Sequence, residues 1–162
     1  RHEFEDRYTF AELCKEAEET DYITSRIDVN NKCFLAPENM TEAIKSYCNN
    51  NDLIIPDTAG EIAAVVYKSL ADSYADTVMQ IEKNLDITYD AIYVIGGGAN
   101  AGYLNQLTAD STGKTVVAGP AEATAIGNIM AQMIADSVFK NLKEARACVR
   151  DSFDIKRFEQ KR

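Results

Sequence analysis

The spacing of polar and apolar residues in the first half of the chain predicts three helices. Each begins with Thr or Asn followed three residues later by Glu, which is the pattern of a capping box, at residues 9–12, 39–42 and 58–61. We expect the helices to run from these caps to about residues 20, 48 and 85. The third has an apolar residue at every fourth position from Ile62 to Val78, which predicts one apolar stripe. Residues 21–37 have no helical period and are expected to form a loop with a short strand at 33–36.

Two short apolar runs in the second half predict β-strands. Ala91–Ile95 has no polar interruption, which is typical of a strand buried on both faces, and Thr115–Ala118 is a second run of this kind. Helices are expected at about 101–112, from Pro120 to about 136, and at about 142–152. Gly113 is expected to end the first of these, and Pro120 to occupy the first helical position of the second. A charged tail finishes the chain.

This order of elements predicts an α/β fold with a helix-rich N-terminal half and a right-handed βαβ unit. A sheet of two parallel strands is not stable alone, so the two strands need neighbours. The chain also begins Arg-His-Glu, without Met. We therefore expect it to be a piece of a larger protein in which further strands of the sheet precede residue 1.

Charge and composition narrow the classes of partner. The formal net charge of −9 argues against a nucleic acid or an anionic membrane surface, because both are bound by clustered Lys and Arg. The chain has no signal peptide and no long apolar run, and a cytoplasmic location is expected. Its four cysteines form no C-x-x-C pair and His2 is its only histidine, which argues against a zinc site. Free thiols are expected, and Cys33 and Cys48 can pair only if the fold brings them together.

Three of the chain's 8 glycines, Gly96, Gly97 and Gly98, stand directly behind the first predicted strand. A strand, a glycine-rich turn and a helix form a phosphate-binding arrangement, because a ligand can approach the bare backbone and the unpaired N–H groups of the helix. A plainer alternative is a turn in which strand and helix pack closely. A third is the dinucleotide pattern G-x-G-x-x-A, which ends at Ala101 but lacks the acidic residue expected after the next strand. No Walker A sequence is present.

Four stretches resemble the FGGY carbohydrate kinases: residues 27–40, 89–110, 117–128 and 145–159. The second contains the three glycines. The third, with Ala-Gly-Pro-Ala-Glu-Ala-Thr-Ala-Ile-Gly-Asn at 118–128, is similar to the branch of that family that phosphorylates L-rhamnulose, as are the first and fourth. The stretches occur in the family's order, and the resemblance covers nearly the whole chain.

The resemblance implies an actin-like, ribonuclease H-like ATPase fold in which parallel strands are flanked by helices and two domains close on ATP and sugar. Residues 1–162 would be the later part of the second, nucleotide-binding domain, with its earlier strands and the whole first domain outside this chain. The implied activity is transfer of the ATP γ-phosphate to the 1-hydroxyl of L-rhamnulose, with Mg²⁺ as cofactor. The catalytic Asp, the sugar contacts and the Mg²⁺ ligands would precede residue 1. We therefore assign no catalytic or metal-binding residue here, and expect the chain alone to be inactive.

The resemblance also implies an ATP site at the glycine turn. Gly97 is the residue most directly implied, and Gly96 and Gly98 flank it. Asn100 and Ala101 complete the expected adenosine-side wall of the ATP cleft. Many relatives have Asn where this chain has Ala101, so we expect contact there through the backbone.

Other functions stay open. The chain could belong to another FGGY kinase that acts on a different ketose or polyol, to a non-catalytic actin-like regulator that binds nucleotide, or to a stand-alone α/β interaction domain. The residues upstream of Arg1 separate a kinase from a regulator, because a kinase needs the Asp base and two phosphate loops there.

Overall fold

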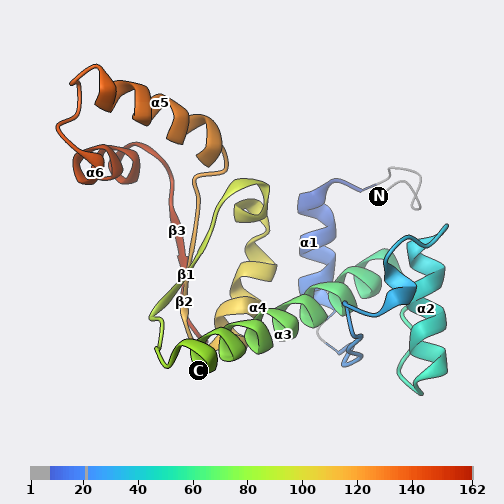
Figure 1. Ribbon diagram of the computed structural model, residues 1–162. Coiled ribbons are helices and arrows are strands. Elements are labelled where there is room, and N and C mark those ends of the chain that lie inside the picture. The colour runs from blue at the N-terminus through green and yellow to red at the C-terminus, as the bar shows by residue number, and fades with distance from the viewer. Residues whose placement is uncertain (1–7, 21, 162) are drawn as a thin grey trace.

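The computed structural model of the chain describes residues 8–20 and 22–161, and Figure 1 shows two lobes connected by one long helix. The α-helices of this part are α1 (Phe10–Glu19), α2 (Met40–Asn50), α3 (Ala59–Leu85), α4 (Gly102–Thr112), α5 (Ala123–Ala135) and α6 (Leu142–Ser152). Two 3₁₀ helices, η2 (Lys32–Phe34) and η3 (Gly96–Asn100), and three strands, β1 (Ala91–Val94), β2 (Thr115–Ala118) and β3 (Lys156–Phe158), complete it. The prediction of an α/β fold with a helix-rich N-terminal half is confirmed.

The first three helices begin where the capping patterns predict. Thr9 accepts the backbone N–H of Glu12, whose side chain accepts the N–H of Thr9, and Thr58 and Glu61 form the same reciprocal pair. The cap of α2 is one-sided. The side chain of Asn39 accepts the N–H of Glu42, but the side chain of Glu42 does not form the reciprocal bond of a capping box. These contacts join residues close in the chain, and spacing alone therefore predicts them.

The apolar stripe expected along α3 is confirmed for Ile62 and Val66, which pack in or against the core, and is wrong at Tyr74. Ile62 is buried, but Tyr74 is 42% exposed, and the buried face continues from Ile62 through Val65 and Ser69 instead. A spacing of four exceeds the 3.6-residue turn, so each such step moves a side chain about 40° around the helix. The observed buried face combines spacings of three and four residues, which average close to one helical turn and keep its side chains on one side of α3.

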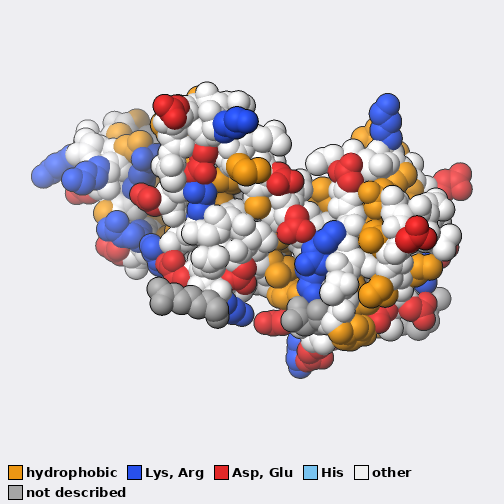
Figure 2. Space-filling model, turned by 90° about the horizontal axis from the view of Figure 1, so that it is seen from below, with side chains coloured by type: hydrophobic (Ala, Val, Ile, Leu, Met, Phe, Trp, Pro, Cys, Tyr) orange, Lys and Arg blue, Asp and Glu red, His pale blue; other side chains and the backbone are white. Residues whose placement is uncertain are grey.

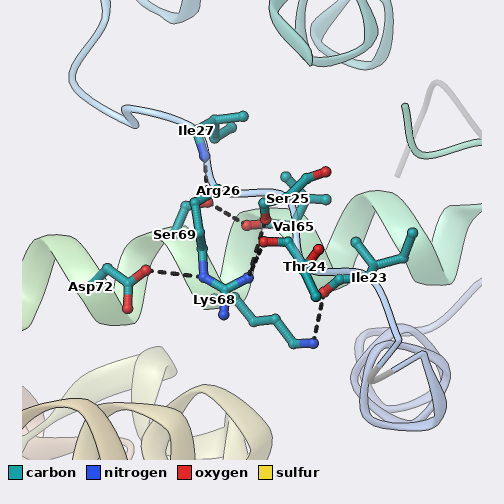
Figure 3. A network of polar contacts seen from close by, with 9 residues as sticks. All are labelled: Ile23, Thr24, Ser25, Arg26, Ile27, Val65, Lys68, Ser69 and Asp72. Carbon is teal, nitrogen blue, oxygen red and sulfur yellow. Dashed lines mark hydrogen bonds and ion pairs between the residues drawn. The ribbon is translucent and has the colours of Figure 1, made fainter. Parts of the chain in front are cut away.

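The segment before α2 is held against α3 by buried polar side chains (Figure 3). The Nζ of Lys68, which is 5% exposed, donates to the carbonyl of Ile23 at 2.9 Å. The N–H of Ile27 donates to Ser69 Oγ at 3.0 Å. These bonds direct the apolar side chains of the segment into the core of this lobe, which comprises Ile23, Ile27, Ile44, Cys48, Ile62 and Val65.

The short strand expected at 33–36 is absent, and the 3₁₀ helix η2 lies there instead. The side chain of Asn31 accepts the N–H of Cys33 at 3.1 Å and starts this helix. An apolar run too short to show a period cannot distinguish a strand from a single helical turn. Cys33 is exposed and Cys48 is buried, and both are free thiols.

The sheet has the order β1–β2–β3. β1 and β2 are parallel, with Ala91 opposite Thr115, as a βαβ unit requires. β3 runs antiparallel to β2, with Phe158 opposite Val116, although its charged sequence does not predict a strand. The third strand makes β2 central and buried, whereas β1 lies at the edge and its Tyr93 is 73% exposed. The expectation that β1 is buried on both faces is therefore wrong.

The turn after β2 also differs from expectation. Pro120 does not begin a helix, because α5 starts at Ala123 and Glu122, expected inside that helix, stands just before it. The carbonyl of Pro120 instead accepts the N–H of Gly96 at 3.3 Å. Pro120 thus belongs to the turn and joins it to the glycine turn that follows β1.

A partly buried ion pair connects the end of α3 to the beginning of the sheet. Lys114 Nζ lies 2.7 Å from Glu82 Oε1, and their side chains are only 11% and 20% exposed. The same carboxylate accepts the N–H of Tyr89 at 2.7 Å, and Lys114 also donates to the carbonyl of Tyr89 at 2.9 Å. These bonds lower the pKa of Glu82 below its ordinary value. The cluster fixes where both parallel strands begin.

We predict that Glu82→Gln lowers the free energy of unfolding at neutral pH and weakens its dependence on acid. A carboxyl group with a lowered pKa stabilises the fold above the ordinary glutamate pKa of about 4.3, and this contribution is lost as the pH falls through its folded pKa. Urea denaturation at neutral pH and between about pH 5 and 3 measures both effects. Glu19→Gln is the control, because its pair with Lys15 is 3.9 Å long and largely exposed. Equal acid dependence in the two variants would contradict the prediction.

Candidate functional site

The glycine turn lies at the carboxyl end of the parallel strands. η3 follows β1 directly, and Gly96 takes a left-handed conformation with φ of +75° that glycine adopts without strain. Its N–H binds the carbonyl of Pro120, and the N–H of Gly119 binds the carbonyl of Val94 at 2.9 Å. Two strand-to-helix turns are thereby joined side by side. In open α/β sheets, ligands bind at this end of the strands.

Gly97 has the features expected of a residue that meets a ligand through its backbone. It is exposed, and apart from adjoining parts of its own turn no atom lies within 4 Å of the position that a β-carbon would occupy. In a 3₁₀ helix each N–H pairs with the carbonyl three residues back. For Gly97 that carbonyl belongs to Val94, which precedes η3 and accepts the N–H of Gly119, so the N–H of Gly97 has no partner inside the helix that it begins. Close packing of strand and helix does not require a glycine at this position.

The other predicted residues lie around Gly97. Gly98 and Asn100 are exposed, and Ala101, partly exposed, is the cap residue of α4. Neither Ala101 nor Ile95, the cap residue of η3, accepts an N–H through a side chain. The first N–H groups of both helices are therefore not capped by these side chains, which suits a polar or anionic ligand. The assignment of ATP to these residues stays a prediction.

Asn105 supports the turn from behind and was not identified from the sequence. It lies on α4, is 3% exposed, and its Nδ2 donates at 3.3 Å to the carbonyls of both Gly98 and Ala99. With Thr108 and Ala109 it forms the buried face of α4. The available signal was an amide side chain on a helical face of small residues, because a buried amide needs a hydrogen-bond partner.

An apolar groove adjoins the turn. It has a volume of about 1070 Å³ and lies between the sheet and the pair α5 and α6, which Figure 1 places together at one end of the sheet. Ile95 and Pro120, which flank the two joined turns, line it, and so do Arg146, Arg150 and Arg157. Tyr93 of β1 and Val117 of β2 form the wall of the groove on the side of the sheet.

The remaining chemistry of the described residues is sparse. Among them, no three or more His, Cys, Asp or Glu side chains gather closely enough to hold a metal ion. Figure 2 shows acidic, basic and apolar side chains interspersed on the face seen from below. In the part of the chain that the structure describes, no helix combines the length and apolar composition needed to cross a membrane.

The chain is similar to one described family and to several named proteins. Residues 3–135 match the FGGY family of carbohydrate kinases, C-terminal domain. The chain is 47% identical over 154 residues to a rhamnulokinase of Bacillus subtilis (strain 168). The matched region is 95% of this chain and 32% of that protein. Identity is 45% over 152 residues to a rhamnulokinase of Oceanobacillus iheyensis (94% and 32%) and 42% over 158 residues to one of Halalkalibacterium halodurans (98% and 34%). The chain spans about a third of the length of these curated relatives.

Proposed function

Because the chain belongs to the FGGY family of carbohydrate kinases, whose C-terminal domain has the actin-like ATPase fold, we propose that it forms part of an ATP-dependent sugar kinase. The reaction that we propose for the complete protein is transfer of the γ-phosphoryl group of ATP to L-rhamnulose, giving L-rhamnulose 1-phosphate. The curated relatives of highest identity reported above, all named rhamnulokinase, support this substrate.

The glycine turn is proposed as the adenosine-side wall of the ATP cleft, formed by Gly96, Gly97, Gly98, Asn100 and Ala101. The observation that carries this proposal is at Gly97, an exposed residue with open space at its β-carbon position, whose N–H has no partner inside the helix. Backbone amides can hold a nucleotide without a basic patch, which agrees with the net charge of −9. Phosphoryl transfer depends mainly on such positioning and on charge stabilisation.

The cofactor Mg²⁺ is proposed to neutralise charge that develops on the phosphates. The described residues bring no suitable group of carboxylates together, so its protein ligands and the general base are proposed to lie outside this chain. The role of this chain is then to bind and orient the nucleotide, and alone it should be inactive.

The chain is further proposed to be the later part of the nucleotide-binding domain. Strand β1 lies at the edge of the sheet, where Tyr93 is 73% exposed, and Ile95, directly after the strand, is 62% exposed. Backbone groups of alternate residues point to the two sides of a strand, and Asp90 and Val94 direct their carbonyls to the β2 side. The backbone of Tyr93 therefore faces the outer edge. Earlier strands of the same polypeptide are proposed to pair there, with the first domain beyond the cleft in a cytoplasmic enzyme.

A coupled assay of ADP release tests the activity. The complete protein should release ADP with L-rhamnulose and ATP, whereas the 162-residue chain should not. Faster turnover with another ketose or a polyol would assign a different FGGY kinase. Nucleotide binding without ADP release for any sugar would overturn the kinase in favour of a nucleotide-binding regulator.

A further inference from the structure

We propose that Asn105 is a positioning residue for the ATP site, because its side-chain amide fixes the orientation of the glycine turn. This inference rests on the proposed function. A single amide nitrogen carries two hydrogens, and Nδ2 of Asn105 donates to both Gly98 and Ala99 carbonyls at 3.3 Å. The carbonyl of Gly98 also accepts the N–H of Ala101 at 3.1 Å. The side chain therefore holds two successive peptide groups of η3.

The direction of these bonds determines what the turn presents. In a helix the carbonyls point toward the C-terminal end and the N–H groups toward the N-terminal end. Asn105 binds η3 through the carbonyls of Gly98 and Ala99, so it leaves unused the N–H groups at the beginning of the turn, including that of the exposed residue Gly97. The opposite end of the turn is fixed by the bond between Gly96 and Pro120.

A turn with three successive glycines needs such support. Glycine loses more conformational freedom on folding than other residues, and Gly97 makes no side-chain contact that could restrict it. Asn105 is 3% exposed, so water does not compete for its amide. Without the amide, the Gly98 and Ala99 carbonyls lose a buried donor, and the turn can rotate its peptide groups away from the ligand.

The side chain of Thr108 provides a matched control on the same helix. It is also 3% exposed, and its hydroxyl donates to the carbonyl of Leu104 at 2.8 Å. Thr108→Val removes one buried hydrogen bond to the backbone without touching the glycine turn. Any loss of stability common to buried polar residues of α4 should appear in this variant too.

The test compares Asn105→Asp, Asn105→Ala and Thr108→Val in the complete protein. Asp has the shape of Asn but presents oxygens to the two carbonyls, which repels them. Ala removes the amide without this repulsion, and Asn105→Ala replaces Asn105→Asp in the test if the Asp variant does not fold. We expect either Asn105 variant to raise the KM for ATP by about tenfold or more while the KM for sugar stays within about twofold. Backbone hydrogen exchange at residues 96–101 should accelerate in the Asn105 variants alone.

Gly97→Val in the same assay separates the proposed ATP site at the glycine turn from the proposed positioning role of Asn105. If Gly97→Val raises the KM for ATP while the Asn105 variants behave like Thr108→Val, the positioning role is wrong and the ATP wall stands. Unchanged exchange at 96–101 in the Asn105 variants would overturn the positioning role as well. If no variant changes the KM for ATP, the assignment of the turn to ATP is wrong, and the role of Asn105 is wrong with it.

Discussion

Gly97→Val in the complete kinase is expected to raise the KM for ATP by about tenfold to a hundredfold, equivalent to about 1.4–2.8 kcal/mol of binding free energy. The KM for the sugar should hardly change. The added side chain would enter space that is open for at least 4 Å around the β-carbon position, where we place the nucleotide. Gly97 does not have the left-handed φ of Gly96, so its backbone accepts valine. Steady-state kinetics with each substrate varied in turn measures both constants.

Gly113→Val separates loss of the ligand site from loss of the fold. Gly113 ends α4 with φ of +68°, a conformation that costs a residue with a side chain about 1–2 kcal/mol. Gly113→Val should unfold at a lower temperature and keep the ratio of the KM for ATP to the KM for sugar. Gly97→Val should raise that ratio and leave the unfolding temperature nearly unchanged. An equal rise of both KM values in Gly97→Val would argue that the turn does not contact ATP.

The expectation for Gly97 follows from how the two strand-to-helix turns, after β1 and after β2, are joined. The bonds between Gly96 and Pro120 and between Gly119 and Val94 use the polar groups that face the neighbouring turn. Asn105 uses the carbonyls at the other end of η3. The N–H of Gly97 lies at the beginning of η3, where it has no partner inside that helix, and we propose that it binds the ligand. A chain with a net charge of −9 can bind a nucleotide in this way through fixed amides.

Local features of the fold could be predicted from the sequence. The capping pairs at Thr9 and Thr58 join residues three apart, and Gly113 ends its helix as its position predicts. The glycine turn is local as well, since one continuous stretch carries the strand, the turn and the helix. Spacing and residue type are sufficient for such elements because no distant residue decides them.

Features that depend on distant residues could not be predicted. β3 is three residues long and begins Lys-Arg, and only its pairing with β2 makes it a strand. Pro120 has the sequence of a helix start, but its carbonyl is bound by Gly96, 24 positions earlier in the chain. The apolar stripe of α3 fails at Tyr74 for a different reason, because a fixed spacing of four drifts around the helix.

Buried polar side chains were the largest omission. Asn105 and Lys68 read as ordinary helical residues until the fold shows what each one binds. The sequence shows that they are polar but not that they are buried, and burial makes their hydrogen bonds decisive.

Gly60→Ala is expected to lower the free energy of unfolding by about 1–3 kcal/mol, as overpacking of a dense contact does. Gly60 lies in the first turn of α3 where α1 crosses it. A β-carbon there would lie 2.9 Å from Cβ of Glu16 and 3.2 Å from the backbone carbon and oxygen of the same residue. Real β-carbons do not approach other atoms this closely, and the obstacle includes backbone, so α1 must move away from α3. Urea denaturation at neutral pH measures the loss.

Gly127→Ala is the matched control, because it places the same methyl group in another helix. No atom lies within 4 Å of the β-carbon position of Gly127 in α5, and its φ is not left-handed. Alanine is favoured over glycine inside a helix by about 0.5–1 kcal/mol, so this variant should be more stable than the parent chain. The two substitutions should therefore change stability in opposite directions. Equal stabilisation by both would mean that α1 and α3 do not touch at Gly60, and the packing that joins them would have to be reassigned.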